Sequence, residues 1–456
     1  MSQPYRYPDP DSRSAQFFAR ARGVLANGYS RVVASAPAPG PYVLYARSAQ
    51  GARVTDADGQ ELIDFNNNNT ALIHGHAHPA IVEAVSKQIA SGSAYSFGSE
   101  AELALAELLQ ERVPSCERLR FSNSGTEAVM MAIRTARAYT GRPKIAKIEG
   151  AYHGTYDYSE ISYWPGPDVW GEPDPAPVPN AVGVPQTILD DTIVIPWNDP
   201  EAGERLLEPH AEQLAAVLLD PVSDVAALVP PTPEFIAMLR DFTRRHGIVF
   251  IVDEVVSLRL GYGGAQGEFG IEPDLTTFAK IIGGGFPVGG MGGSQEIMRV
   301  FEGSFFAPDA KDRPRISHGG TFNGNVTSMT AGLAAMELLT PEACDRLNAL
   351  GVSARGARRG AFASAGYPGL VTGMGSFFRL HLTTRPIRNY RDSYWREDER
   401  AWIFELQGHL LRHGVFAQPH MGCLSTAMTE ADLDHLAGAV ESGLRALLAE
   451  GKAPQA

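Results

Sequence analysis

The chain has only three cysteines among its 456 residues: Cys116, Cys344 and Cys423. Because they lie far apart and are odd in number, we expect neither a disulfide framework nor a metal site of paired cysteines. Such sparse cysteine usage fits a reducing compartment best. The sequence therefore predicts a cytoplasmic protein.

Long apolar runs and basic clusters are also missing. No stretch of about 18 apolar residues occurs, which predicts that no segment spans a membrane. The polar start, Met1 to Asp11, predicts that there is no signal peptide. The net charge of −13 argues against nucleic acid or an anionic membrane as a partner. Small anionic ligands are not excluded, because they need only a local site.

What the chain does contain is a regular succession of short apolar segments and amphipathic segments. Strands are predicted at 119–121, 144–148, 193–195, 214–219 and 248–252, with helices between them. This rhythm is typical of an α/β fold with a parallel sheet. We predict a large domain at 62–325 and a smaller α+β domain built from 1–61 and 326–456.

Two stretches do not fit that rhythm. Residues 164–185 contain seven prolines, which predicts an irregular insert, either a disordered loop or an active-site lid. His74, His76 and His78 have a spacing that raises the question of a metal site. They lack the carboxylate and the helical context of a zinc motif, so we predict no metal and a loop with a helix-capping histidine.

Polar residues end two of the apolar runs, where open parallel sheets bind ligands. Lys280 precedes the glycines 283–285, and a lysine that is fixed and partly desolvated has the lowered pKa that a Schiff base to an aldehyde requires. The alternative is a solvated lysine. Asp253 ends the run 248–252, and a carboxylate buried there needs a cationic or hydrogen-bonding partner. Val255 could press on the face of a ring.

Two further loops add to this pattern. Ser124-Gly125-Thr126 lies between a strand and a helix, where free N–H groups and hydroxyls can cradle a phosphate. Its alternative is an N-cap that forms a capping box with Glu127. Tyr152 follows a strand and is either a stacking ring or an ordinary packed tyrosine. A phosphate cradle, a stacking ring, a buried aspartate and a lysine amine together fit one cofactor, pyridoxal 5′-phosphate.

Six motifs carry a family resemblance. They are Gly75-His76-Ala77-His78-Pro79, Phe121–Ala128, Tyr152-His153-Gly154, Asp253-Glu254-Val255, Lys280–Gly285 and Gly320–Asn325. Over about residues 15–450 the chain resembles class III aminotransferases, and within them the group of glutamate-1-semialdehyde aminomutase and the β-phenylalanine and D-phenylglycine transaminases. The resemblance implies a fold-type I transferase dependent on pyridoxal phosphate, with a mostly parallel seven-stranded sheet.

The resemblance also implies roles for single residues. Lys280 is implied as the Schiff-base lysine and Asp253 as the partner of the pyridine nitrogen, while Tyr152 and Val255 cover the two ring faces. Ser124, Gly125 and Thr126 are implied on the phosphate. Thr321 matches a threonine that reaches the phosphate of the neighbouring subunit, which implies a homodimer with shared active sites.

Some positions depart from the aminomutase pattern. Where that enzyme carries Glu-Pro-Val-x-x-Asn-x-Gly, this chain has Asp220-Pro221-Val222-Ser223-Asp224-Val225-Ala226-Ala227. Arg31 matches an arginine that holds the substrate carboxylate in β-phenylalanine transaminases, and a guanidinium suits a carboxylate because its fork is bidentate. The alternative is a solvated arginine. His420 stands where those enzymes have a second arginine. Arg259 and Arg379 are other candidate anion contacts.

We therefore expect a transaminase that moves an amino group from an amino acid, with β- and aryl-amino acids as candidate donors, to 2-oxoglutarate or pyruvate by a ping-pong mechanism. The first alternative is an aminomutase, an isomerase that returns the amine to the same skeleton and needs no added oxo acid. The second is a non-catalytic binding protein of the same fold, against which the intact Lys280 argues.

Overall fold

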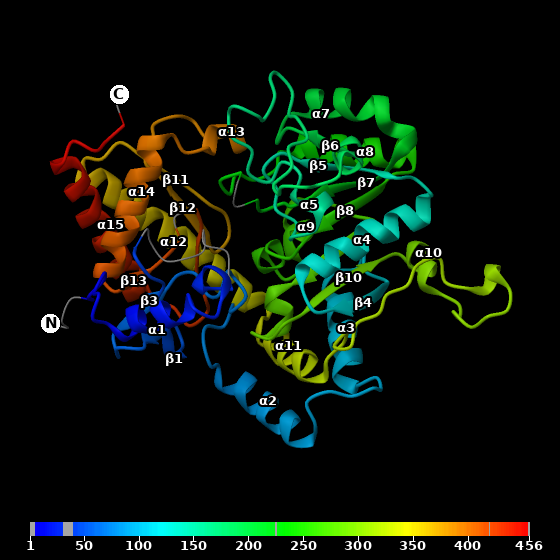
Figure 1. Cartoon of the computed structure of the whole chain (residues 1–456), viewed down its shortest axis with the longest axis horizontal. Helices are drawn as coiled ribbons and strands as arrows, with labels where there is room; N and C mark the ends of the chain where they lie inside the picture. Colours follow the sequence, from blue (N-terminus) through cyan, green and yellow to red (C-terminus); the bar gives the residue numbers. More distant parts are fainter. Residues whose placement is uncertain (1–4, 31–39, 224–225, 419, 455–456) are drawn as a thin grey trace. The chain divides into compact units, whose positions relative to one another are not determined.

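The computed structural model describes residues 5–30, 40–223, 226–418 and 420–454. The chain forms two compact units (Figure 1). One consists of Met1–Pro79, Asp345–Ile387 and Asp392–Ala456, and the other of Ala80–Cys344 with Arg388–Arg391. The predicted domain boundaries at residues 62 and 325 remain a prediction.

The unit that contains residues 80–344 is built on a seven-stranded sheet with the order β4-β10-β9-β8-β7-β5-β6. The strands are β4 (Arg118–Ser122), β5 (Lys144–Ile148), β6 (Thr192–Ile195), β7 (Leu214–Leu219), β8 (Val249–Asp253), β9 (Leu275–Ala279) and β10 (Gly289–Gly293). β10 runs antiparallel to both of its neighbours, and the pairings from β9 through to β6 are parallel. The predicted α/β fold with a mostly parallel seven-stranded sheet is confirmed.

Helices cover both faces of this sheet, as Figure 1 shows. On one face α4 (Gly125–Thr140) packs apolar side chains against β5, β7 and β8. On the other face α7 (Pro200–Leu207) and α8 (Pro233–His246) do the same. Every side chain of β7 is buried, which explains its unbroken apolar sequence, because a central parallel strand is covered on both sides.

Shorter and peripheral helices complete the unit. They are α2 (Pro79–Ser91), α3 (Glu100–Arg112), α5 (Asp157–Glu160), α6 (Gln186–Asp190), α9 (Gly264–Phe269), α10 (Gln295–Met298) and α11 (Val326–Leu338). Of these, α2 and α11 share a small apolar cluster that contains Ile81, Val85 and Ala335.

The strand β10 was not predicted from the sequence, because glycine is unfavourable inside strands. The structure shows why glycine is needed there. A Cβ atom on Gly289 would lie 2.0 Å from the carbonyl oxygen of Ser124, and one on Gly292 would lie 2.7 Å from Cys116 Sγ. The glycines therefore let β10 pass close to the turn that precedes α4.

The other unit contains two smaller sheets. In the first, β1 (Ala46–Gln50), β2 (Arg53–Asp56) and β3 (Glu61–Asp64) are antiparallel, and β13 (Val415–Phe416) joins β3 in parallel. The second contains β11 (Leu370–Thr372), β12 (Phe377–His381) and β14 (Gly422–Cys423). The helices are α1 (Arg13–Ala21), α12 (Pro341–Ala365), α13 (Tyr390–Ser393), α14 (Glu397–Arg412) and α15 (Glu430–Ala449), of which α12 and α13 extend across unit boundaries.

The proline-rich insert has a defined path along the unit with the large sheet. The Ser162 hydroxyl donates to the carbonyl oxygen of Ala176 (2.7 Å) and accepts from the N–H of Val178 (2.9 Å). Asp174 binds Arg205 through both carboxylate oxygens, at 2.6 and 2.9 Å. A disordered loop was therefore the wrong alternative, and the role as a lid stays a prediction.

The three clustered histidines bind protein groups. His76 Nε2 lies 2.7 Å from Asp64 Oδ2, and His74 Nδ1 lies 3.0 Å from the hydroxyl of Thr426. Within the described ranges no group of three or more histidine, cysteine or acidic side chains is arranged to hold a metal ion. Across those same ranges, each helix is too short or too polar to span a membrane.

Candidate functional site

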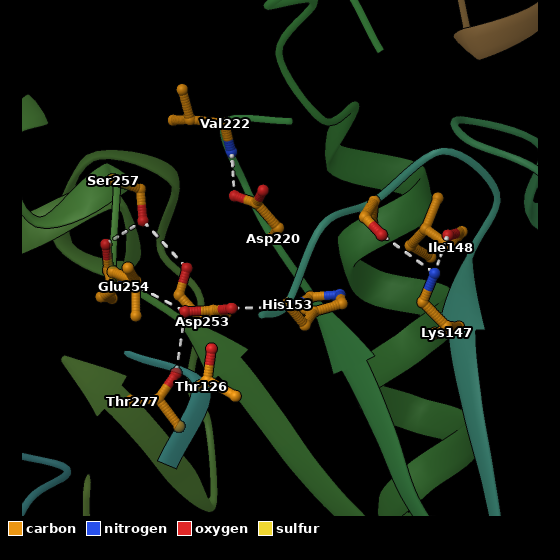
Figure 2. A network of polar contacts seen from close by, with 12 residues as sticks. Thr126, Lys147, Ile148, His153, Asp220, Val222, Asp253, Glu254, Ser257 and Thr277 are labelled. Atoms are coloured by element: carbon orange, nitrogen blue, oxygen red, sulfur yellow. Dashed lines mark hydrogen bonds and ion pairs between the residues drawn. The ribbon is translucent and has the colours of Figure 1, made fainter. Parts of the chain in front are cut away.

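Asp253, the last residue of β8, connects several segments of the candidate site. Its side chain is buried, and Oδ1 accepts hydrogen bonds from the Thr277 hydroxyl (2.8 Å) and the Val255 N–H (3.1 Å). Oδ2 accepts one from His153 Nδ1 at 2.8 Å (Figure 2). A carboxylate offers about four acceptor sites, so Oδ2 can still accept from one more N–H donor.

His153 lies in the loop after β5 and is fully buried. Burial lowers the pKa of its imidazole, which favours the neutral ring. Since a carboxylate only accepts, the single N–H of that ring is on Nδ1 and points to Asp253. Nε2 is buried with no hydrogen-bond partner among the described residues. The sequence reasoning missed His153, although the Tyr-His-Gly tripeptide after a strand was a signal for it.

The helix α4 begins at Gly125, and its start contains the predicted N-cap but not the predicted capping box, in which Glu127 would accept from the N–H of Ser124 itself. Ser124 is the N-cap, because its hydroxyl accepts from the N–H of Glu127 (3.2 Å), and Glu127 Oε2 accepts from the N–H of Asn123 (2.6 Å). The N–H groups of Gly125 and Thr126 do not take part in this capping. As the first N–H groups of the helix, they also have no helical carbonyl group to donate to. Together with the positive end of the helix dipole, they can bind an anion.

Close contacts bring this loop to the ends of the strands. A Cβ atom on Gly125 would lie 3.2 Å from both methyl carbons of Val255 and 3.3 Å from Ala279 Cβ. A Cβ atom on Gly154 would lie 2.5 Å from the Thr126 hydroxyl oxygen. The start of α4, the turn after β8 and the end of β9 therefore meet, and glycine leaves the space open where they do.

Lys280 follows β9 directly and is half-buried. Its φ of +53° is in the left-handed region, which costs a residue with a side chain about 1–2 kcal/mol. Gly284 and Gly285 follow with φ of +57° and +98°, so the chain turns sharply after Lys280, where glycine adopts such angles without strain. A strained backbone of this kind persists only where the surrounding structure imposes it, and functional sites are where such positions gather.

Tyr152 is half-buried, and its ring centroid lies 4.7 Å from that of Tyr163. This contact agrees with the alternative of an ordinary packed tyrosine. Stacking of the Tyr152 ring on a bound ligand stays a prediction. Its neighbour His153 nevertheless binds Asp253, so the backbone of Tyr152 is fixed beside the strand ends.

The remaining candidates lie elsewhere or cannot be placed. Thr321 is exposed and lines a cavity of about 300 Å³ with Tyr95, Glu102 and other residues that were not among the predicted site residues. His420 is half-buried and belongs to the other compact unit, and Arg31 lies outside the described residues. All three assignments therefore stay predictions.

The two other arginines considered as anion contacts are both buried. Arg259 lies in a short helical turn after β8, and Arg379 lies in β12 of the other unit. Arg379 Nη2 donates to the carbonyl oxygen of Ser393 at 3.4 Å, and its guanidinium carbon lies 5.5 Å from the centre of the Trp395 ring. The structure thus gives Arg379 a packing role within its own unit.

The gathered residues define what the site can bind. The N–H groups at the start of α4 suit an anion, the free lone pair of Asp253 suits a protonated ring nitrogen, and Lys280 supplies an amine at the strand end. These groups come from three loops at one edge of the sheet, where open α/β sheets bind ligands.

Comparison with known sequences gives a consistent result. The family described as Aminotransferase class-III matches residues 34–415. Glutamate-1-semialdehyde 2,1-aminomutase from Sorangium cellulosum (strain So ce56) is 38% identical over 449 residues, which cover 98% of this chain and 99% of that protein.

Among the solved structures that resemble almost the whole chain are two that are named as transaminases. An omega-transaminase from Sphaerobacter thermophilus matches with a TM-score of 0.90 and 49% identity, over 96% of this chain and 98% of that one. A β-phenylalanine aminotransferase from Variovorax paradoxus matches with a TM-score of 0.85 and 32% identity, over 99% of this chain and 97% of that one.

Proposed function

The chain belongs to the class III aminotransferases, and on this premise we propose that it is a transaminase that moves an amino group from an amino acid to 2-oxoglutarate or pyruvate by a ping-pong mechanism. Family membership confirms the predictions of an enzyme, of the fold-type I architecture and of pyridoxal phosphate as the cofactor. The reaction, the donor and the residue roles below are the proposal.

The residues at the strand ends fit the cofactor. Asp253 would accept the pyridine N–H on its remaining lone pair, and the N–H groups of Gly125 and Thr126, with the Ser124 and Thr126 hydroxyls, would hold the phosphate. Val255 and Tyr152 cover the ring faces. The missing Cβ of Gly125 beside Val255 supports this arrangement, because a side chain there would occupy the space next to the ring.

The bound cofactor supplies an electron sink for the carbanion that forms when a substrate carbon loses its proton. Asp253, whose carboxylate accepts three hydrogen bonds from the protein, would keep the proton on the ring nitrogen of the bound cofactor. Neutral His153 holds Asp253 in place without adding positive charge. With the cofactor bound, Lys280 Nζ would take the proton from the substrate carbon and deliver it to the C4′ carbon of the cofactor.

The observation that favours a transaminase is the likeness over almost the whole chain to an omega-transaminase, at 49% identity. The segment 220–227 adds support, because it departs from the aminomutase pattern. Ala227 stands where the aminomutase has glycine, although its φ of +64° is in the left-handed region that glycine adopts most easily. The aminomutase remains the second candidate, since a relative of that name is 38% identical.

Substrate recognition is assigned to Arg31 and His420. The match to a β-phenylalanine aminotransferase supports β- and aryl-amino acids as donors and the Arg31 guanidinium as the carboxylate partner. His420 takes the place of a second arginine, so recognition of a second carboxylate differs there. Cytoplasmic localisation rests on the small and odd number of cysteines, which lie far apart in the sequence.

We also assign Thr321 to the active site of a partner subunit, which makes the enzyme a homodimer. Exposed aromatic side chains support an interface around this residue: Tyr95 is 45%, Phe97 87% and Phe322 57% exposed. The first two line the same cavity as Thr321, and Phe322 follows Thr321 in the chain. Large apolar side chains gathered on a surface indicate a protein contact.

The two candidate reactions differ in their need for an acceptor. We predict that the holoenzyme consumes a β- or aryl-amino acid only when an oxo acid is added, because each cycle must unload the amino group. A panel of donors, assayed with and without 2-oxoglutarate or pyruvate, measures this requirement, with Lys280→Ala as the inactive control. Rearrangement of glutamate 1-semialdehyde without any added oxo acid would instead identify an aminomutase.

Arg31→Gln tests carboxylate recognition. We expect the KM for an amino-acid donor to rise about ten- to hundredfold, since hydrogen bonds between charged groups contribute roughly 1.5–3 kcal/mol. The KM for a matched amine without the carboxylate should not change. Equal effects of the substitution on both donors would contradict the assignment.

Mixed dimers test the shared active site. Lys280→Ala and Thr321→Ala subunits, unfolded and refolded together, should regain activity above that of either parent, because one site of each mixed dimer then has an intact Lys280 and an intact partner Thr321. Random pairing predicts a recovery of about a quarter of the wild-type activity. No recovery beyond the sum of the parents would place Thr321 outside the partner's site.

A further inference from the structure

A fully buried lysine lies next to the candidate site and takes no part in the mechanism above. Lys147 is on β5, and its side chain has no solvent exposure. Its amine donates to the carbonyl oxygens of Ala151 (2.9 Å) and Ile161 (2.6 Å), and lies 3.5 Å from that of Ile148. Figure 2 shows the amine directed from the strand towards the loop that follows it.

The two close acceptors lie at opposite ends of one loop. We call residues 149–163 the Tyr152 loop; it contains Tyr152 and His153 directly after Ala151. Ala151 and Ile161 are ten positions apart in sequence, yet one amine binds both carbonyl groups. Lys147 therefore closes the loop at its base, as a crosslink between the two ends would.

No carboxylate forms a direct ion pair with Lys147 within the described part of the chain. Burial lowers the pKa of the amine to about 7, and only the more distant charges of Glu149 and Glu160 oppose this effect. Glu149 is itself bound by Arg391, at 2.8 and 2.9 Å. An interior lysine without an ion pair is costly compared with an apolar side chain of the same length, so core packing alone does not account for it.

The other contacts of the Tyr152 loop show what Lys147 adds. At the inner end His153 binds Asp253, and Thr126 Oγ1 accepts from the N–H of Thr155 at 3.2 Å. Both contacts join the loop to the candidate site, and neither fixes its two ends to each other. One backbone hydrogen bond does join the ends, from the N–H of Gly150 to the carbonyl oxygen of Ser162 at 2.8 Å. Lys147 adds a second link one residue further into the loop, at Ala151, which directly precedes Tyr152.

We propose that Lys147 is a positioning residue, whose amine holds the Tyr152 loop closed at Ala151 and Ile161 so that Tyr152 and His153 keep their places beside the cofactor. This inference rests on the proposed function, because the placement of Tyr152 matters only when a ring binds against it. Lys147 itself touches neither cofactor nor substrate.

The test compares Lys147→Met with Lys144→Met. Methionine keeps most of the apolar length of lysine and removes the donors. Lys144 lies on the same strand, where its amine binds the carbonyl oxygen of Asp190 and lies 3.6 Å from Asp191 Oδ1, away from the Tyr152 loop. For both variants, the dissociation constant of pyridoxal phosphate from the apoenzyme and the visible circular dichroism of the bound cofactor are measured, together with kcat and KM.

Lys147→Met should weaken cofactor binding about tenfold, reduce the circular dichroism band and lower kcat about ten- to hundredfold, because displacement of a site group by about 1 Å has effects of this size. Lys144→Met should behave as wild type in all three measurements. Lys147→Gln, which keeps two N–H donors, should recover part of the loss. In a Tyr152→Ala background, Lys147→Met should have a clearly smaller effect on the cofactor signals. The reason is that Lys147 acts largely through the contact between the Tyr152 ring and the cofactor, which that background has already removed.

Three outcomes would overturn the proposal: cofactor signals of Lys147→Met equal to those of Lys144→Met, additive effects with Tyr152→Ala, or loss of folding in both Lys147 variants by circular dichroism and gel filtration. The last would assign Lys147 to the stability of the whole unit. Failure of the proposed function is distinguishable, because the wild-type protein would then show no transamination with any donor and acceptor.

Discussion

The hydrogen bonds of one buried carboxylate hold the candidate site together. Asp253 connects its own strand to β9 through Thr277, to the Tyr152 loop through His153, and to the following turn through the N–H of Val255. A buried carboxylate without such donors would cost several kcal/mol. The carboxylate that the chemistry requires therefore also fixes a neighbouring strand, the Tyr152 loop and the turn that follows its own strand.

Backbone geometry supplies the second constraint. The loop before α4 can approach Val255 and Ala279 because position 125 is glycine, and β10 can pass beside the same loop because position 289 is glycine. At Lys280 the chain instead accepts a strained left-handed φ with a long side chain. We interpret this strain as a consequence of directing an amine from the end of β9. The strained conformation persists because the neighbouring strands fix the backbone around it.

Much of the candidate site could be predicted from the sequence, because a polar residue that directly follows an apolar run can be recognised without a structure. Lys280 and Asp253 were named in this way. Val255 was named for its place after Asp253, and the loop at 124–126 for its place before a helix. The structure brings these segments to one edge of the sheet. His153 and Lys147 were not recognised, because a pattern cannot reveal which buried polar groups meet. The strand β10 was missed for a related reason: its glycines are explained only by the neighbours they make room for.

The central claim is that Lys280 is the amine that carries the cofactor. Reduction of the holoenzyme with borohydride, followed by mass spectrometry of its peptides, tests this claim most directly, because it fixes the cofactor to whichever lysine holds it. The account predicts a phosphopyridoxyl group on Lys280 and an unmodified peptide around Lys147. A label on any other lysine, or no label on a protein that shows the visible absorbance of bound cofactor, would contradict it.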